Sequence, residues 1–193
     1  MKAKFLWPRP SSKGLVCSIP MTAGFMSGAV LRDEAGSFNG TATNSPTVAY
    51  PGLDFTAAST QWVDIGAGPS SVKTISLWVK QDDVAGNEYP IDLNGTDYIA
   101  VESGVVTVYG LVGHALYVDG AAATSGVTTI TALVWHHIAL TDATANNASD
   151  FDIGRVTAAY FDGLISDVRA YDRVLGADEI GDIYRLQRHK YQV

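Results

Sequence analysis

The four glutamates of this 193-residue chain set the first limit on its chemistry. Hydrolysis of a glycosidic bond usually needs two carboxyl groups that flank the bond from one face of a site. The glutamates are Glu34, Glu88, Glu102 and Glu179. They lie far apart in the sequence, and no two of them fall within one strand-length segment. We therefore expect the chain to be non-catalytic, with no catalytic residue assigned.

Two adjacent histidines, His136 and His137, follow Trp135 in a segment with strand character. Neighbouring side chains of a strand point to opposite faces, so these imidazoles cannot chelate one metal ion as a pair. The pattern favours one packed, hydrogen-bonded histidine and one exposed histidine. The single cysteine, Cys17, lies in an apolar segment, which favours a small core residue over a nucleophile.

The most informative elements follow each other near the C-terminus. In residues 161–171 apolar side chains alternate with polar ones such as Asp167 and Arg169, the pattern of a half-buried antiparallel strand. After Gly176 the period changes to that of a helix, with Ile180 and Ile183 on one face. Acidic residues lie at its start and arginines at its end, as the helix dipole favours. The sequence predicts a short helix that packs against a sheet.

Short apolar or alternating segments, separated by Gly-, Asn- and Asp-containing turns, fill the rest of the chain. This spacing is typical of an antiparallel sandwich. The predicted strands span 14–20, 47–55, 61–66, 73–80, 89–92, 97–101, 105–110, 114–119, 127–131, 134–141, 151–155 and 160–171. We expect an N-terminal arm at 1–13 and one β-sandwich domain at 14–193. The prolines of the arm disfavour a helix or a central strand, and its apolar residues favour packing on this domain or on a neighbouring subunit.

Several of these segments contain specific sequence motifs. The run FDGLISDVRAYDRVL at 161–175 resembles the closing segment of laminin-G-like domains of the concanavalin A-like superfamily. Other segments of that family are matched in the same order along the chain. They are DEAGSFNG at 33–40, TISLWVK at 74–80 and WHHIALT at 135–141. The resemblance implies an all-β fold: a two-sheet antiparallel jelly-roll sandwich with one short C-terminal α-helix.

The same resemblance implies a metal site. In such domains an early loop and the second acid of the closing strand can bind calcium, which prefers several oxygen ligands. The matching positions here are Asp33, the carbonyl groups around Gly36 and Asn39, and Asp167. The loop is degenerate, so a solvated turn and a salt bridge from Asp167 to an arginine stay open as the alternative. The paired-glutamate motif E-x-D-x-x-E of glycoside hydrolases in this superfamily is absent.

Charge is distributed unevenly along the chain, whose formal net charge is −7. Residues 1–32 carry five Lys or Arg and no acid, and residues 185–193 carry three and no acid, so the remainder is acidic. Such a body disfavours nucleic acid as a partner. No apolar run is long enough for a signal peptide or a membrane span, so we expect no membrane association. The basic ends either neutralise the body or dock an acidic partner.

These observations lead to three functional hypotheses. The first is a non-catalytic structural or decoration protein on the surface of a virion, expected to be a bacteriophage, which contacts other virion proteins through the N-terminal arm and the basic termini. The second is an extracellular carbohydrate-binding or adhesion module, and the third a glycoside hydrolase. A homo-oligomer stays open. The aromatic side chains that could stack on sugars lie near predicted strand ends, but a sandwich core also needs aromatics. They are Tyr89, Tyr98, Tyr109, Tyr117 and Tyr160.

Overall fold

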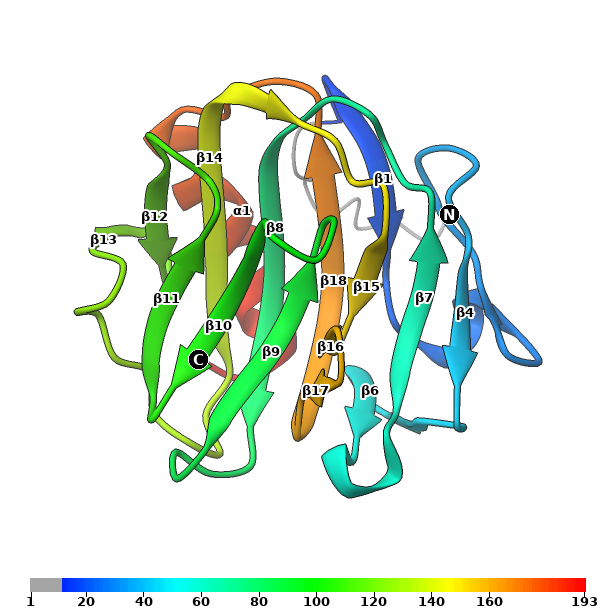
Figure 1. The fold of residues 1–193 in the computed structure, drawn as a ribbon. Coiled ribbons are helices and arrows are strands. Elements are labelled where there is room, and N and C mark those ends of the chain that lie inside the picture. Colours follow the sequence, from blue (N-terminus) through cyan, green and yellow to red (C-terminus); the bar gives the residue numbers. More distant parts are fainter. Residues whose placement is uncertain (1–11) are drawn as a thin grey trace, which may run out of the picture.

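Two antiparallel sheets lie face to face in the computed structural model, and one helix covers the outer face of one of them (Figure 1). The model describes residues 12–193. The predicted arm therefore lies outside the described residues, except for residues 12 and 13. The prediction of an all-β sandwich with two antiparallel sheets and a C-terminal helix is confirmed.

The first sheet, sheet A, has eight strands in the order β13-β12-β14-β8-β18-β6-β5, with β1 also paired to β18. Its strands are β1 (Leu15–Ile19), β5 (Thr47–Ala49), β6 (Gly52–Phe55), β8 (Val72–Gln81), β12 (Ala115–Val118), β13 (Ala121–Ala123), β14 (His136–Asn146) and β18 (Gly163–Tyr171). All of its pairings are antiparallel. The long strands β8, β14 and β18 form its centre.

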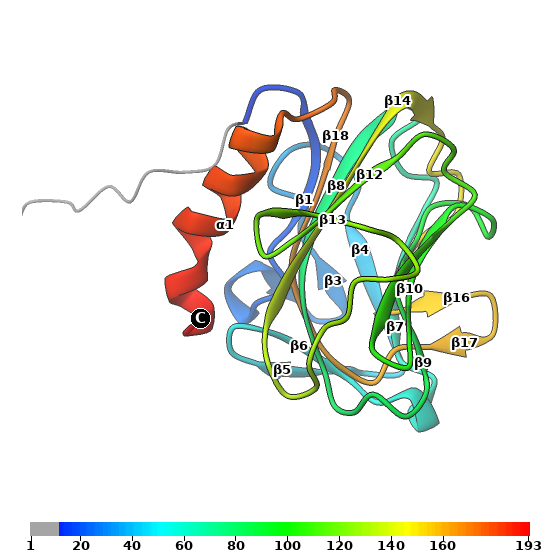
Figure 2. The same ribbon diagram turned by 90° about the vertical axis from the view of Figure 1, so that its left-hand side faces the viewer.

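The second sheet, sheet B, also has eight strands, in the order β11-β10-β9-β15-β7-β4-β3-β2. They are β2 (Met26–Ser27), β3 (Val30–Leu31), β4 (Gly40–Thr43), β7 (Trp62–Gly66), β9 (Asn87–Asp92), β10 (Tyr98–Glu102), β11 (Val105–Tyr109) and β15 (Phe151–Ile153). A small hairpin, β16 (Arg155–Val156) with β17 (Ala159–Tyr160), follows β15 and stands out from sheet B on the side away from the helix (Figure 2).

The core fills the space between the sheets. Leu77 and Val79 of β8 point inward from sheet A, while Ile91 of β9 and Ile153 of β15 point inward from sheet B, and all four belong to one buried cluster. Because side chains of a strand alternate, the residues between these positions face outward. The core thus fixes which side chains each sheet presents on its outer face.

The helix α1 (Ala177–Tyr191) packs on the outer face of sheet A (Figure 2). Its Ile180 and Ile183 are buried against Tyr171 of β18, as the sequence periodicity predicts. At its start the Glu179 carboxylate accepts a hydrogen bond from the Gly176 N–H at 3.0 Å, which satisfies a donor that the helix leaves free. None of the helices described is long and apolar enough to cross a membrane.

Three details of the predicted strands differ. Residues 47–55 form a hairpin, β5 and β6, because the chain turns at Tyr50 and Pro51. Residues 127–131 contribute only an isolated bridge between Val105 and Thr129. Strands β2, β3, β4 and β13 were not predicted: β2 and β3 are two residues long, and β4 and β13 consist of Gly, Ala and Thr and carry no large apolar residue.

Candidate functional site

Within residues 12–193, no helix lies over the outer face of sheet B (Figure 1). Three tyrosines on adjacent strands form a ladder on this face: Tyr89 on β9, Tyr98 on β10 and Tyr109 on β11. Tyr98 and Tyr109 are Cα partners, and their rings stack with centroids 4.7 Å apart. The rings of Tyr89 and Tyr98 are tilted, with centroids 6.3 Å apart. We call these three residues the tyrosine ladder.

The ladder is partly exposed, in contrast to the aromatics of the core. Ile99 and Val106, on the same strands, are buried in the core and fix the outward direction of Tyr98 and Tyr109. The hydroxyl group of Tyr109 donates a hydrogen bond to Oε1 of Glu102 at 2.7 Å. That hydrogen bond raises the pKa of Tyr109 to about 12, so the ring keeps its proton at neutral pH.

A row of carboxylates continues from the ladder across the same face. Asp92 on β9 is the Cα partner of Tyr98, Asp152 on β15 is the partner of Asp92, and Asp64 on β7 is the partner of Asp152. Asp92 and Asp152 are each 1% exposed, whereas Asp64 is exposed. Cross-strand register therefore assembles the three carboxylates into one row from β9, β15 and β7, which lie apart in the sequence.

Asp152 lies beside the hairpin β16–β17. Arg155 Nε donates a hydrogen bond to Asp152 Oδ2 at 2.7 Å, and the Arg155 guanidinium lies 4.3 Å from the ring centre of Trp62. The Tyr160 ring lies 5.9 Å from the Trp62 ring. Burial raises the pKa of Asp152 to about 6, against the lowering effect of Arg155. Within residues 12–193, Asp152 Oδ1 and Trp62 Nε1 are buried without a hydrogen-bond partner.

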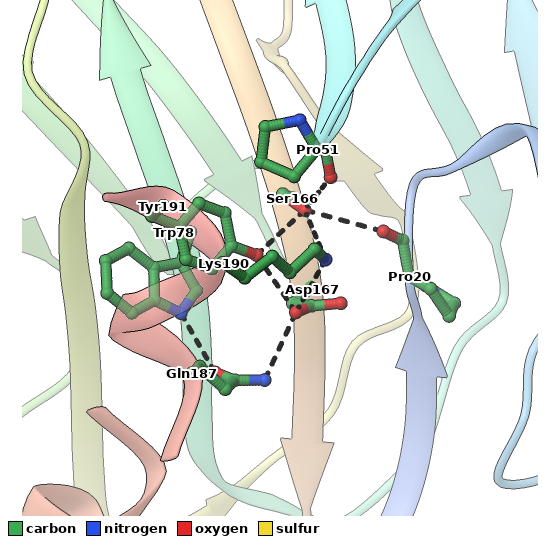
Figure 3. Close-up of polar contacts among 8 residues, drawn as sticks. All are labelled: Pro20, Pro51, Trp78, Ser166, Asp167, Gln187, Lys190 and Tyr191. Carbon is green, nitrogen blue, oxygen red and sulfur yellow. Dashed lines mark hydrogen bonds and ion pairs between the residues drawn. The ribbon is translucent and has the colours of Figure 1, made fainter. Parts of the chain in front are cut away.

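The predicted calcium ligand Asp167 lies instead on the helix-covered face (Figure 3). Its Oδ2 atom is 3.0 Å from Lys190 Nζ, and it accepts hydrogen bonds from the Tyr191 hydroxyl at 2.9 Å and the Gln187 amide at 3.2 Å. The neighbouring Ser166 hydroxyl donates to the Pro51 carbonyl at 2.6 Å. Asp167 thus pairs with a lysine of α1, and the alternative of a salt bridge to an arginine is replaced by this contact.

Asp33 organises its own loop. Its carboxylate accepts hydrogen bonds from the N–H groups of Ser18, Ala35 and Phe38, at 2.7, 2.9 and 3.1 Å. Its own N–H donates to Asn39 Oδ1 at 2.9 Å, so Asn39 contributes its side chain here. Gly36 lies next to this carboxylate, where a Cβ atom would come within 3.3 Å of Oδ2.

The calcium ligands predicted from the sequence thus have other partners. Residues 12–193 contain no group of three or more His, Cys, Asp or Glu that could hold a metal ion. The Asp33 carboxylate is occupied by three N–H donors and the Asp167 carboxylate by an ammonium group, so the donor set does not fit calcium as it is arranged. Calcium binding stays a prediction from the sequence.

The remaining candidate residues are structural in their contacts. His137 is buried, and burial lowers its pKa to about 3; its Nε2 lies 2.8 Å from Ser76 Oγ. His136 is partly exposed and its Nδ1 lies 2.8 Å from Asp119 Oδ2. Cys17 is buried in the core, which raises the pKa of its thiol.

The glutamates are spread over the molecule. Glu102 faces outward from sheet B, Glu88 is buried between the sheets and accepts the Asp162 N–H at 2.6 Å, and Glu179 lies at the start of α1. Burial raises the pKa of Glu88 to about 7. These three glutamates therefore lie at different places in the fold and do not face each other across one site. The absence of catalysis stays a prediction.

The sequence named four of the five aromatics that gather at sheet B as candidates, but it did not separate them from Tyr117, which packs towards α1. It missed Trp62, Arg155 and the pair of Asp92 and Asp152. The only local signal for the acidic row is an aspartate at an outward position of each strand, flanked by apolar inward residues. Their pairing depends on strand order, which a local pattern does not contain.

No protein-family model matches this chain, and no curated protein matches it in sequence. Solved structures match its fold. A Trypanosoma rangeli sialidase mutant with trans-sialidase activity aligns with 95% of this chain, with a TM-score of 0.62 and 14% identity, and the alignment covers 34% of the sialidase. Domain 4 of AbnA, a GH43 extracellular arabinanase from Geobacillus stearothermophilus solved with arabinotriose, aligns with 88% of this chain and 98% of its own length, with a TM-score of 0.59 and 14% identity.

The binding domain of botulinum neurotoxin DC, solved with SialylT, aligns with 91% of this chain and 52% of its own, with a TM-score of 0.50 and 13% identity. At these identities the likeness shows the fold alone. That fold is a sandwich of two antiparallel sheets. This chain spans about a third of the length of the sialidase that it resembles.

Proposed function

We propose that this chain is a non-catalytic glycan-binding module and that the tyrosine ladder is its binding surface. The observation that carries the proposal is the position of three partly exposed tyrosines on adjacent strands of an uncovered sheet face. A sugar ring has an apolar C–H face and a rim of hydroxyl groups. Aromatic rings match the apolar face, while phenol hydroxyls and carboxylates match the rim.

The surroundings of the ladder support this use. The partly exposed carboxylate of Glu102 supplies hydrogen-bond acceptors beside the rings, and the hairpin β16–β17 stands beside β9 on the outer side of sheet B (Figure 2). One structure of similar fold was solved with arabinotriose and another with SialylT, and this also favours a sugar ligand. The rigidity of paired strands keeps the entropic cost of binding low.

The test is glycan binding by the Tyr98→Ala/Tyr109→Ala double variant, measured first by array and then by calorimetry. Each lost aromatic contact is worth roughly 1 kcal/mol, so we expect affinity to fall at least about tenfold. The matched control is Tyr50→Ala, which removes a tyrosine that is 79% exposed and lies outside sheet B. Equal affinity of the double variant and the control would refute the ladder as the binding surface.

A location on a virion surface is a separate proposal, and it rests on the sequence. The basic termini and the apolar residues within the 1–13 segment favour docking to other particle proteins. The glycan-binding face would then point away from the particle. Deletion of residues 1–13 should then abolish incorporation into the particle while glycan binding persists. Incorporation at the wild-type level would contradict this location and leave an extracellular module as the alternative.

A further inference from the structure

The strands of sheet B differ from those of sheet A in charge. They contain five acidic residues and no Lys, Arg or His. The acids are Asp64, Glu88, Asp92, Glu102 and Asp152. Four of them face outward, and Glu88 faces the core. This distribution bears on which glycans the outer face can accept.

The ladder itself lies in this negative environment. The pKa of Tyr98 is raised by partial burial and by the neighbouring charges of Glu102 and Asp92, together with Tyr89, and no cation is among the causes. Arg155, from the adjoining hairpin, is held by Asp152 and lies over Trp62. Arg155 is therefore already paired.

The same face also has unused hydrogen-bonding capacity. Asp152 is 1% exposed and lies on the outer side of its strand, since Ile153 next to it is in the core. Its Oδ1 atom has no partner in the described part of the chain, and neither has Trp62 Nε1, from a strand paired with β15. Both atoms are buried, so they cost stability as they stand and lie out of reach of a surface ligand, which leaves Glu102 and Asp64 as the accessible acids of this face.

From these observations we infer that the sheet B face selects neutral glycans and rejects glycans that carry carboxylate or sulfate groups. The inference rests on the proposed function and names its ligand class. Carboxylates accept hydrogen bonds from sugar hydroxyls, whereas an acidic sugar placed beside Glu102 and the row meets like charge, and the strands of sheet B offer it no cation. This selectivity differs from that of a site for sialylated ligands.

The experiment compares ligands that share a backbone and differ in charge. Affinity electrophoresis and calorimetry would use asialofetuin against fetuin, hydroxyethylcellulose against carboxymethylcellulose, and fully methyl-esterified polygalacturonate against polygalacturonate. We expect binding to one or more neutral members and at least about tenfold weaker binding to the acidic partner, with the difference reduced at high salt. Equal or tighter binding of the acidic member would overturn the inference but leave the proposed function standing. Binding of neither member in any pair would overturn both.

The Glu102→Gln variant isolates the contribution of charge. Glutamine retains an oxygen that accepts from the Tyr109 hydroxyl, so the ladder keeps its geometry while one charge is removed. Discrimination against acidic glycans should fall severalfold, and Glu102→Lys should bring it close to zero or reverse it. The matched control is Asp182→Asn, which removes one exposed charge from α1 and should leave discrimination unchanged. Unaltered discrimination in both Glu102 variants would contradict the inference.

Discussion

The outer faces of sheets A and B each carry a tryptophan and a paired aspartate, but the two tryptophans differ in burial and in hydrogen bonding. On sheet A, Trp78 is fully buried under α1, and its Nε1 donates to Gln187 Oε1 at 2.9 Å. On sheet B, Trp62 lies beneath an arginine and a tyrosine, and its Nε1 has no partner in the described part of the chain. Each face also has an aspartate paired with a cation.

The helix accounts for this difference. It brings Gln187, Lys190 and Tyr191 over sheet A and supplies hydrogen bonds to Asp167 and Trp78 (Figure 3). Sheet B receives only a short hairpin, so its aromatics stay partly exposed. Covering a sheet face adds a second core, while an uncovered face keeps polar and aromatic groups available for a ligand.

The largest expected effect comes from truncating the centre of the covered face. Trp78→Ala removes a fully buried ring that stacks on Tyr191 with centroids 4.0 Å apart. We expect the free energy of unfolding to fall by about 4 kcal/mol. Tyr98→Ala, on the open face, should cost about 1 kcal/mol or less, because that ring is partly exposed. Urea unfolding of both variants measures the contrast, and similar losses would contradict it.

A smaller effect is expected from Lys190→Met, which removes the ammonium group of the covered face. Asp167, whose side chain is 11% exposed, then keeps only neutral donors from Gln187 and Tyr191. We expect a loss of about 2 kcal/mol in urea unfolding, because a mostly buried carboxylate loses its cation. Lys190→Arg is the control and should retain most of the stability. A loss below about 0.5 kcal/mol for Lys190→Met would show that the pair adds little.

The pH dependence of stability should have opposite sign for a titratable group on each face. The pKa of Asp152 on the open face is raised from 3.8 to about 6, so the folded state binds the extra proton and stability is lost as pH rises through this range. The pKa of His137 on the covered face is lowered from 6.5 to about 3, so the unfolded state binds the extra proton and stability is lost as pH falls through that range.

Asp152→Asn and His137→Gln should therefore change the pH profile of Tm in opposite directions. Relative to its own value at pH 4, Asp152→Asn should lose about 3 °C less than the wild type by pH 7. His137→Gln should lose less than the wild type between pH 6.5 and 3. Thermal unfolding in a series of buffers measures both slopes, and profiles parallel to the wild type would contradict the sign difference.

The smallest effect is expected at the start of α1, which the covered face depends on. Glu179 accepts from the Gly176 N–H and pairs with Arg173, and these contacts lower the pKa of Glu179 to about 2. Because the pair is partly exposed to solvent, Glu179→Gln should cost about 0.5 kcal/mol. Glycan binding should be unchanged. If Glu179→Gln lowered the free energy of urea unfolding as much as Lys190→Met does, the first turn of α1 would stabilise the helix as much as the Lys190 contact, which would contradict this ranking.

Local pattern in the sequence determined the elements of this protein. Alternation in residues 161–171 and the change of period after Gly176 predicted β18 and α1, because the burial of one face imposes those periods. The prediction of one packed histidine is confirmed by His137, whereas His136, which was expected to be exposed, has a side chain only 13% exposed that contacts Asp119. The resemblance of the sequence motifs to laminin-G-like domains then predicted the two-sheet architecture.

Tertiary structure alone decided which groups meet. Asp92 and Asp152 become neighbours only because β9 pairs with β15, and Asp167 reaches Lys190 at a register shift in β18 between Ser166 and Arg169. Alternation says that two sets of side chains point to opposite faces of a strand. It does not say which face a helix will cover, because that depends on strand order and on where the chain returns. The open tyrosine ladder is therefore a property of the assembled sheets.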